Sequence, residues 1–306
     1  MLTIVQAALE AGFLYAPVAM ALFLSFSILN IADMTTDGAF VLGSAVSAMM
    51  CLSGHPVLAL PAGMLAAAAA GFITAFLQTK LSVPSILAGI ITNIGLYSIN
   101  LMVMGKSNQS LFQTDTIYTL AQGAGFAGSW YKVAVTALIV LALAAVLVLF
   151  LGTRLGLSIR ATGDNTAMVR ASSINPAFTI TVGLCVSGAL CALSGGLLAQ
   201  YQKSCDINVG TGMVTIALAS LIIGETLVGK RTMLRRVLGV VFGSCLYRFI
   251  VAVALRFNVP AAAMKLVSAI IVAVAISMPA IREHFAFEKR KHAARARRAA
   301  AVKEGK

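Results

Sequence analysis

Long apolar runs, separated by short polar segments, follow one another along almost the whole chain. A membrane helix needs about 20 mainly apolar residues, and several of the runs reach or approach that length. The pattern predicts helical membrane segments over residues 11–31, 39–52, 57–77, 83–104, 133–151, 177–199, 214–228, 237–255 and 261–280. We therefore expect an all-α, polytopic transmembrane bundle of about eight or nine segments, some of them short or broken.

The composition fits a membrane protein. Hydrophobic residues make up 59% of the chain and charged residues 11%, whereas about a quarter of a soluble domain is charged. We expect one membrane domain over residues 1–281 and a basic tail over residues 282–306. A removable signal peptide is not expected, because the start lacks a basic region and Glu10 precedes the first apolar run.

The positions of Lys and Arg predict the orientation, since short cytoplasmic loops carry an excess of both. Basic clusters lie at Lys80, between residues 154 and 170, between residues 230 and 236, and in the tail. All four agree on a cytoplasmic C-terminus and an extracytoplasmic N-terminus. The expected location is the cell inner membrane. The net charge of +13 then indicates contact with anionic lipid headgroups rather than with nucleic acid.

Residue types that carry catalysis or bind metals are sparse. The five Cys lie in or beside apolar runs without metal-binding spacing, the three His are scattered, and no phosphate-binding G-x-x-x-x-G-K-[ST] loop occurs. We therefore expect no catalytic residue, no metal and no cofactor in this chain, which is not expected to be an enzyme. The Cys and His are interpreted as packing or surface residues.

One polar and basic segment, residues 155–176, separates two long apolar runs. Asp164 or Asn165 can cap a short helix over residues 166–172, and an extended stretch that ends at Gly163 would precede that helix. Two interpretations stay open on the residues alone. The segment is a docking element for a soluble partner, or it is an ordinary cytoplasmic loop whose arginines only set the topology.

Part of this segment matches a known pattern, G-x-x-x-R-A-x-x-x-N, followed later by G-I-N. The matching positions are Gly156, Arg160, Ala161, Asn165, Ile174 and Asn175, while Ser173 replaces the usual glycine. The segment resembles the coupling loop of the permease subunits of ATP-binding-cassette (ABC) importers for branched-chain amino acids and ribose. The resemblance implies a type II ABC importer fold, with ATPase docking at Arg160, Gly163, Asp164, Asn165, Met168, Arg170 and Asn175.

The resemblance also implies the partners and the class of solute. The expected partners are ABC ATPase subunits that hold ATP and Mg²⁺, an extracytoplasmic solute-binding protein and a second copy of the permease. The stretch Asp33-x-Thr35-x-Asp37-Gly38 resembles a sub-branch for tryptophan and tyrosine transport. The resemblance therefore implies that the transported solute is an amino acid, and more narrowly an aromatic amino acid.

Interrupted apolar segments often mark the pathway of a transporter. Residues 30–52 are interrupted between Asp33 and Gly38, and residues 210–229 are interrupted at Gly224 and Glu225. The candidates for a path or gate are Asp33, Thr35, Thr36, Asp37, Gly38 and Glu225. A polar turn at the membrane interface would explain the same residues and stays open.

A polar stripe runs along the segment 83–104. Asn93, Tyr97 and Asn100 recur at helical spacing, so they share one face, which we expect to point to the bundle interior. The stripe lines a translocation path or bonds to neighbouring helices. Arg248 and Lys265 lie within apolar runs; pairing with Glu225, snorkelling, or contact with a solute carboxylate would each explain them.

An alternative from another class is a stand-alone secondary transporter driven by protons or sodium. It would need membrane carboxylates to carry the coupling ion, and the sequence offers only Asp33, Asp37 and Glu225 near the expected pathway.

Overall fold

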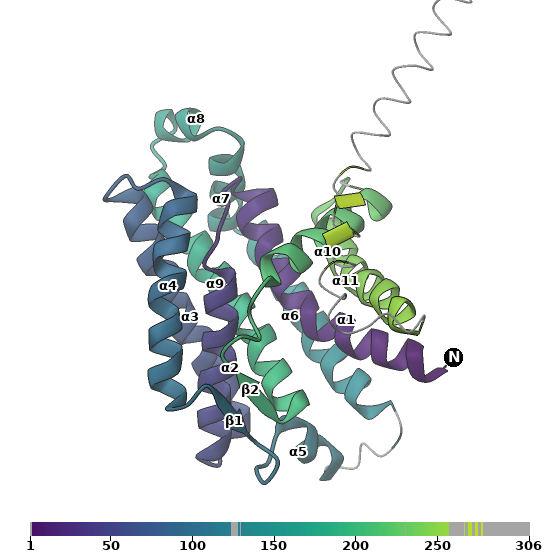
Figure 1. The fold of residues 1–306 in the computed structure, drawn as a ribbon. Coiled ribbons are helices and arrows are strands. Elements are labelled where there is room, and N and C mark those ends of the chain that lie inside the picture. The colour runs from purple at the N-terminus through teal and green to yellow at the C-terminus, as the bar shows by residue number, and fades with distance from the viewer. Residues whose placement is uncertain are drawn as a thin grey trace, which may run out of the picture.

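The computed structural model describes residues 2–123, 128, 130–229 and 231–256, together with a few isolated residues between 266 and 277. Figure 1 shows an all-α bundle. Its main helices are α1 (Leu2–Leu22), α2 (Thr36–Leu52), α3 (Pro56–Thr79), α4 (Ser85–Met104), α6 (Tyr131–Gly152), α9 (Pro176–Gln202), α10 (Met213–Val228) and α11 (Met233–Arg256). The shorter elements are the π-helical turn η1 (Phe23–Ile28), α5 (Ile117–Gly123), α7 (Arg154–Asp164), α8 (Thr166–Ala171), β1 (Asn108–Ser110) and β2 (Ser204–Asp206).

The predicted polytopic bundle is confirmed. Among the described residues, six helices are long and apolar enough to cross a membrane, and α2 and α10 are shorter apolar helices. The predicted segments up to residue 255 correspond to these eight helices within a few residues at most ends. The predicted segment 261–280, with Lys265, lies almost entirely outside the described residues, and so does the tail.

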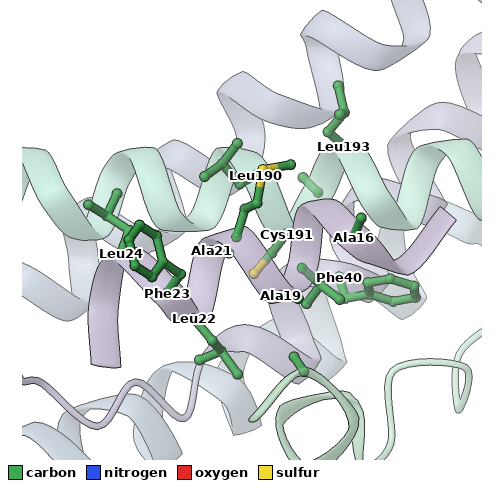
Figure 2. Packing of buried hydrophobic residues seen from close by; sticks show 14 of the residues in the cluster. Ala16, Ala19, Ala21, Leu22, Phe23, Leu24, Phe40, Leu190, Cys191 and Leu193 are labelled. Atoms are coloured by element: carbon green, nitrogen blue, oxygen red, sulfur yellow. The ribbon is translucent and has the colours of Figure 1, made fainter. Parts of the chain in front are cut away.

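Helices α1 and α9 form the centre of the bundle. Over an apolar 18-residue stretch of each helix, 78% of the residues are buried, against 28% in α4 and 22% in α6. Figure 2 shows the apolar core between these helices and the start of α2. The residues labelled there are Ala16, Ala19, Ala21, Leu22, Phe23, Leu24, Phe40, Leu190, Cys191 and Leu193. The outer helices α4 and α6 therefore leave much of their apolar surface for a lipid or a partner chain to cover.

Small residues let α9 approach its neighbours at backbone distance. A Cβ atom on Gly43 of α2 would lie 2.5 Å from the carbonyl carbon of Ala192, closer than such atoms can pack. The hydroxyl of Ser194 donates to the carbonyl of Leu14 in α1 at 2.6 Å. In a bundle without a strong hydrophobic drive between helices, such close packing and hydrogen bonds hold the helices together. These small residues of α9 therefore serve contacts within the chain.

Two helices, α2 and α10, begin after irregular backbone instead of at the end of the bundle. The prediction that the later segment breaks at Gly224 and Glu225 is wrong, because α10 continues through both residues. A Cβ on Gly224 would lie 2.6 Å from the carbonyl carbon of Gly239, so this glycine allows α10 and α11 to cross closely. The break lies earlier, at Gly212, whose φ of +86° immediately precedes α10.

The two ends of the bundle differ in character. Figure 1 shows α7 and α8 at one end, and the β1–β2 ribbon with α5 at the other. Strands β1 and β2 pair antiparallel, with Gln109 opposite Cys205. The order of the helices places the α3–α4 and α10–α11 connections at the same end as α7 and α8. The described basic residues near Lys80, Arg160 and Arg235 therefore share one end of the molecule.

Candidate functional site

The predicted docking segment folds into two short helices joined at Asn165. The side-chain oxygen of Asn165 accepts hydrogen bonds from the backbone N–H of Ala167 at 3.0 Å and of Met168 at 3.1 Å. Of the two predicted caps, Asn165 is therefore the one that starts α8, while Asp164 is the exposed last residue of α7. The cap satisfies N–H groups that a helix start otherwise leaves free.

The expected extended stretch before this cap is wrong. Residues 154–164 form α7, whose first turn is capped by the hydroxyl of Thr153, an acceptor from the N–H of Gly156 at 3.2 Å. Gly163 lies in the last turn of this helix. Its small size is needed, since a Cβ there would lie 2.8 Å from the carbonyl carbon of Ile28. The signal of a helix start at Thr153 was present in the sequence.

Helix α8 is held by one side and exposed on the other. Val169 is 1% exposed, whereas Met168 is 57% exposed and Arg170 is also exposed. Arg160 is only half-buried on α7. Asn175 has a structural task, because its side-chain oxygen caps α9 by accepting from the N–H of Ala177 at 3.0 Å. The exposed surface of α8 is thus small, rigid and basic.

Helix α7 is held to the bundle by a hydrogen bond to α9. The hydroxyls of Thr162 in α7 and Thr179 in α9 lie 2.8 Å apart and share a hydrogen bond. A cavity of about 410 Å³ lies between α7, α9 and the backbone around Asn30. Asn30 has a φ of +57°, where asparagine is tolerated better than most residues. Beside this cavity, Gly163 contacts Ile28, so a displacement of α7 would act there on the backbone that leads from η1 to α2.

A second site lies where the two interrupted helices meet. The carboxylate of Asp37, in the first turn of α2, accepts from the N–H of Gly212 at 3.1 Å and of Val214 at 3.0 Å. These groups form the start of α10, where free N–H groups and the helix dipole favour a negative charge. One side chain thus joins the beginnings of both broken helices.

The polar stripe of α4 reaches the same place. The side-chain nitrogen of Asn100 donates to the carbonyl of Gly38 at 3.2 Å. Asn93 lies so close that a Cβ on Gly38 would be 2.6 Å from its side-chain oxygen. Tyr97 is 53% exposed at the edge of this group. The stripe thus contacts a neighbouring helix through Asn100 and also faces a cavity.

That cavity has a volume of about 200 Å³. Its lining includes Asp37, Gly38, Asn93, Tyr97 and Asn100, all predicted for the path, and also Asn208 and Thr211, which sequence reasoning missed. The spacing Gly210-Thr211-Gly212 before an apolar run was the available signal for Thr211. We call this cavity the α2–α4 pocket.

Three predicted path residues lie elsewhere. Asp33 accepts from the N–H of Thr35 at 2.9 Å and from its hydroxyl, and the hydroxyl of Thr36 donates to the Asp33 carbonyl at 3.3 Å. All three side chains are buried, and they shape the backbone before α2. They belong to the entry of this helix and do not line the α2–α4 pocket.

Two further charges have partners that differ from those expected. Glu225 pairs with Arg236 at 2.8 Å, and the hydroxyl of Ser27 donates to the same carboxylate at 2.9 Å. Glu225 therefore ties α10 to α11 and η1, outside the α2–α4 pocket. Pairing with Glu225, one of the three explanations left open for Arg248, is not found, because the guanidinium of Arg248 lies 3.5 Å from the ring centroid of Tyr15.

Comparisons with known proteins identify the family of the chain. Residues 4–276 match the family described as the permease component of the branched-chain amino acid transport system. The chain belongs to this permease family. It is 33% identical to a tyrosine transport system permease protein of Clostridioides difficile (strain R20291), over 83% of this chain and 84% of that one. It is 28% identical to the uncharacterized protein RP368 of Rickettsia prowazekii (strain Madrid E), over 90% and 98% of the two chains.

A solved structure has a related fold. It is an inward-facing conformation of an ABC transporter assigned to the metal-chelate type, with a TM-score of 0.50 and 15% identity, over 92% of this chain and 85% of that one. By its family, the permease is a multi-pass membrane subunit of an ABC importer, which works with ABC partner subunits. Its role is transport as one subunit of a larger assembly.

Proposed function

We propose that the permease imports an aromatic amino acid with the help of two ATPase subunits, an extracytoplasmic binding protein and a second copy of itself. The solute class is supported by the 33% identity to a tyrosine transport system permease over most of both chains. The permease forms the path, and ATP and Mg²⁺ are held by the ATPase subunits. It binds no cofactor of its own.

The observation that carries this proposal is the rigid helix α8 at the basic end of the bundle (Figure 1). Since short cytoplasmic loops are enriched in Lys and Arg, this end faces the cytoplasm of an inner-membrane protein. The N-terminus then lies outside and the tail inside. With Met168 exposed beside Arg170, α8 offers a small apolar contact rimmed by positive charge to a soluble ATPase.

The mechanism is a rigid-body switch that nucleotide drives in the partner. Closure of the two ATPases moves α8 and α7 together, because Asn165 caps α8 directly after α7 ends. The motion reaches the bundle through the contact of Gly163 with Ile28. Rocking of this kind opens the path to one side and closes it on the other.

The alternative of an ion-coupled secondary transporter has less support. Its coupling carboxylates would have been Asp33, Asp37 and Glu225. Each of them accepts hydrogen bonds from the protein, and Glu225 also pairs with Arg236. These bonds give all three carboxylates a structural task.

The test replaces both charges beside the docking helix, in the double variant Asp164→Ala/Arg170→Ala. We expect the ATPase to dissociate from the purified permease or to hydrolyse ATP without tyrosine uptake in proteoliposomes that contain the binding protein. The matched control is Lys106→Ala/Asp115→Ala, which removes two exposed charges at the opposite end. Normal uptake and normal co-purification of the ATPase by the docking variant would refute the docking assignment.

A further inference from the structure

The α2–α4 pocket contains a buried acceptor that no described residue satisfies. Asn100 is 1% exposed, and its side-chain oxygen has no hydrogen-bond partner. The orientation of the amide is fixed by chemistry, since the carbonyl of Gly38 can only accept and therefore faces the nitrogen of Asn100. Almost all buried polar atoms have partners, so a buried acceptor of this kind beside a cavity indicates a ligand group that donates.

The charge around the pocket also favours a ligand group that is positively charged. A helix start normally attracts an anion, and the start of α10 lies at this pocket. Here the carboxylate of Asp37 already occupies that position, bonded to the N–H groups of Gly212 and Val214. None of the described residues that line the pocket is Lys, Arg or His. The anion site is thus filled from within, and the remaining field favours a cation.

We propose that the α2–α4 pocket binds the protonated amino group of the solute during its passage. An ammonium group carries three donors and no acceptor. It would donate to the free oxygen of Asn100 and lie beside the charge of Asp37. This inference rests on the proposed function, because it assigns a contact to the amino acid that the permease transports.

The size of the pocket limits what it takes. At about 200 Å³ it is smaller than ordinary ligand sites, which measure roughly 300–1,000 Å³. It therefore takes the amino end of the solute and leaves an aromatic side chain outside. The half-exposed ring of Tyr97 lies at its edge, where that side chain would stack. The carboxylate of the solute would be repelled by Asp37 and must point away.

A purely structural explanation of Asn100 would be its hydrogen bond to Gly38, which joins α4 to α2. That bond accounts for the nitrogen of the amide and leaves its oxygen unexplained. A free metal cation could also satisfy the same acceptors. The shared chemistry is a small cation, and the experiment must separate the amine of a solute from sodium.

The test uses the full-length permease in lipid nanodiscs, without ATPase or binding protein, and empty nanodiscs as the blank. Dissociation constants are measured by ligand-observed NMR for tyramine, which has the amine, and for 4-ethylphenol, which is the same molecule without the amine and carries no charge. We expect tyramine to bind at least about tenfold more tightly, as a hydrogen bond to a charged group allows. The titration is repeated with sodium chloride replaced by choline chloride.

Two variants locate the contact. Asp37→Asn keeps the shape and an acceptor for α10 but removes the charge, and Asn100→Leu removes the free oxygen. Each is expected to weaken tyramine binding about tenfold and to leave the amine-free ligand unchanged. The matched control is Thr92→Val on the same helix, a buried polar residue that bonds Thr74 and does not line the pocket. It should bind tyramine as the wild type does.

The outcomes separate the two proposals. Equal binding of the two ligands by the wild type, or sodium-dependent signals without tyramine binding, would overturn the amine site while tyrosine uptake by the full assembly still stands. Failure of the wild-type assembly to take up tyrosine would instead overturn the proposed function. Where Asn100→Leu misfolds, as judged by size-exclusion chromatography, Asp37→Asn alone decides the amine site.

Discussion

The substitution Gly163→Ala tests the mechanical link between the docking helices and the bundle. A Cβ atom at this position would lie 2.8 Å from the carbonyl carbon of Ile28 and 2.9 Å from the Cα of Leu29, and closer still to the Ile28 oxygen. All three are backbone atoms, which cannot rotate away as a side chain can. Helix α7 must therefore move or the turn after η1 must yield.

The size of the effect follows from these distances. Ordinary contact begins near 3.4 Å, so the carbonyl carbon alone must withdraw by about 0.6 Å, the difference from 2.8 Å. Overpacking of a well-packed interior costs about 1–3 kcal/mol. For a chain of 306 residues the corresponding fall in melting temperature is about 2–5 °C. The loss should concern the contact between α7 and η1, while α8 keeps its cap and its exposed surface.

The assay follows unfolding with a thiol-reactive dye in detergent, because Cys51, Cys191 and Cys205 are buried in the folded chain. We expect Gly163→Ala to melt earlier, to retain the ATPase on purification, and to lose tyrosine uptake. Gly152→Ala is the matched control, since a Cβ there meets nothing within 4 Å. Equal melting temperatures and equal uptake for the two variants would refute the proposed link.

Three further predictions follow from single contacts. Asn165→Ala removes the cap of α8 at a cost of about 1 kcal/mol and should weaken retention of the ATPase, whereas Asn165→Ser should retain it. Glu225→Gln should lower stability by about 3 kcal/mol by leaving Arg236 without its buried carboxylate; replacing both by Met should restore most of it, and Arg235→Gln should melt normally. Burial, aided by the charge of Asp206, raises the pKa of the Cys205 thiol to about 12, so it should resist maleimide at pH 8 and react only after unfolding.

The fold was predictable because the apolar runs are long and clearly separated by polar segments. Apolar runs of membrane length can only be helices or strands of a closed barrel, and their length here selects helices. The misplaced break at Gly224 shows the limit of that reasoning. A glycine in an apolar run looks the same in sequence whether it ends a helix or lets a neighbouring backbone approach. Here Gly224 lets the backbone of Gly239 approach. Only the packing partner distinguishes the two.

The candidate sites were predictable in part for a related reason. Local signals identified Asn165 as a possible cap and grouped Asn93, Tyr97 and Asn100 on one face. Contacts between distant segments left no such signal. The pairing of Glu225 with Arg236, and the stacking of Arg248 on Tyr15, depend on how α1, α10 and α11 cross. Charge alone suggested Glu225 as one partner for Arg248, and the crossing of the helices places Tyr15 beside it instead.

The two candidate sites are connected by one short stretch of backbone. Helix α7 presses on Ile28 through Gly163, and the chain then runs past Asp33 into the first turn of α2, where Asp37 holds the start of α10. The stretch is stiff, because Asp33 bonds both the backbone and the hydroxyl of Thr35. A displacement of α7 therefore reaches the beginnings of α2 and α10 together, and these are the segments that line the α2–α4 pocket. Since interfaces of this kind have discrete arrangements, movement at the docking end would change the pocket stepwise and release its ligand.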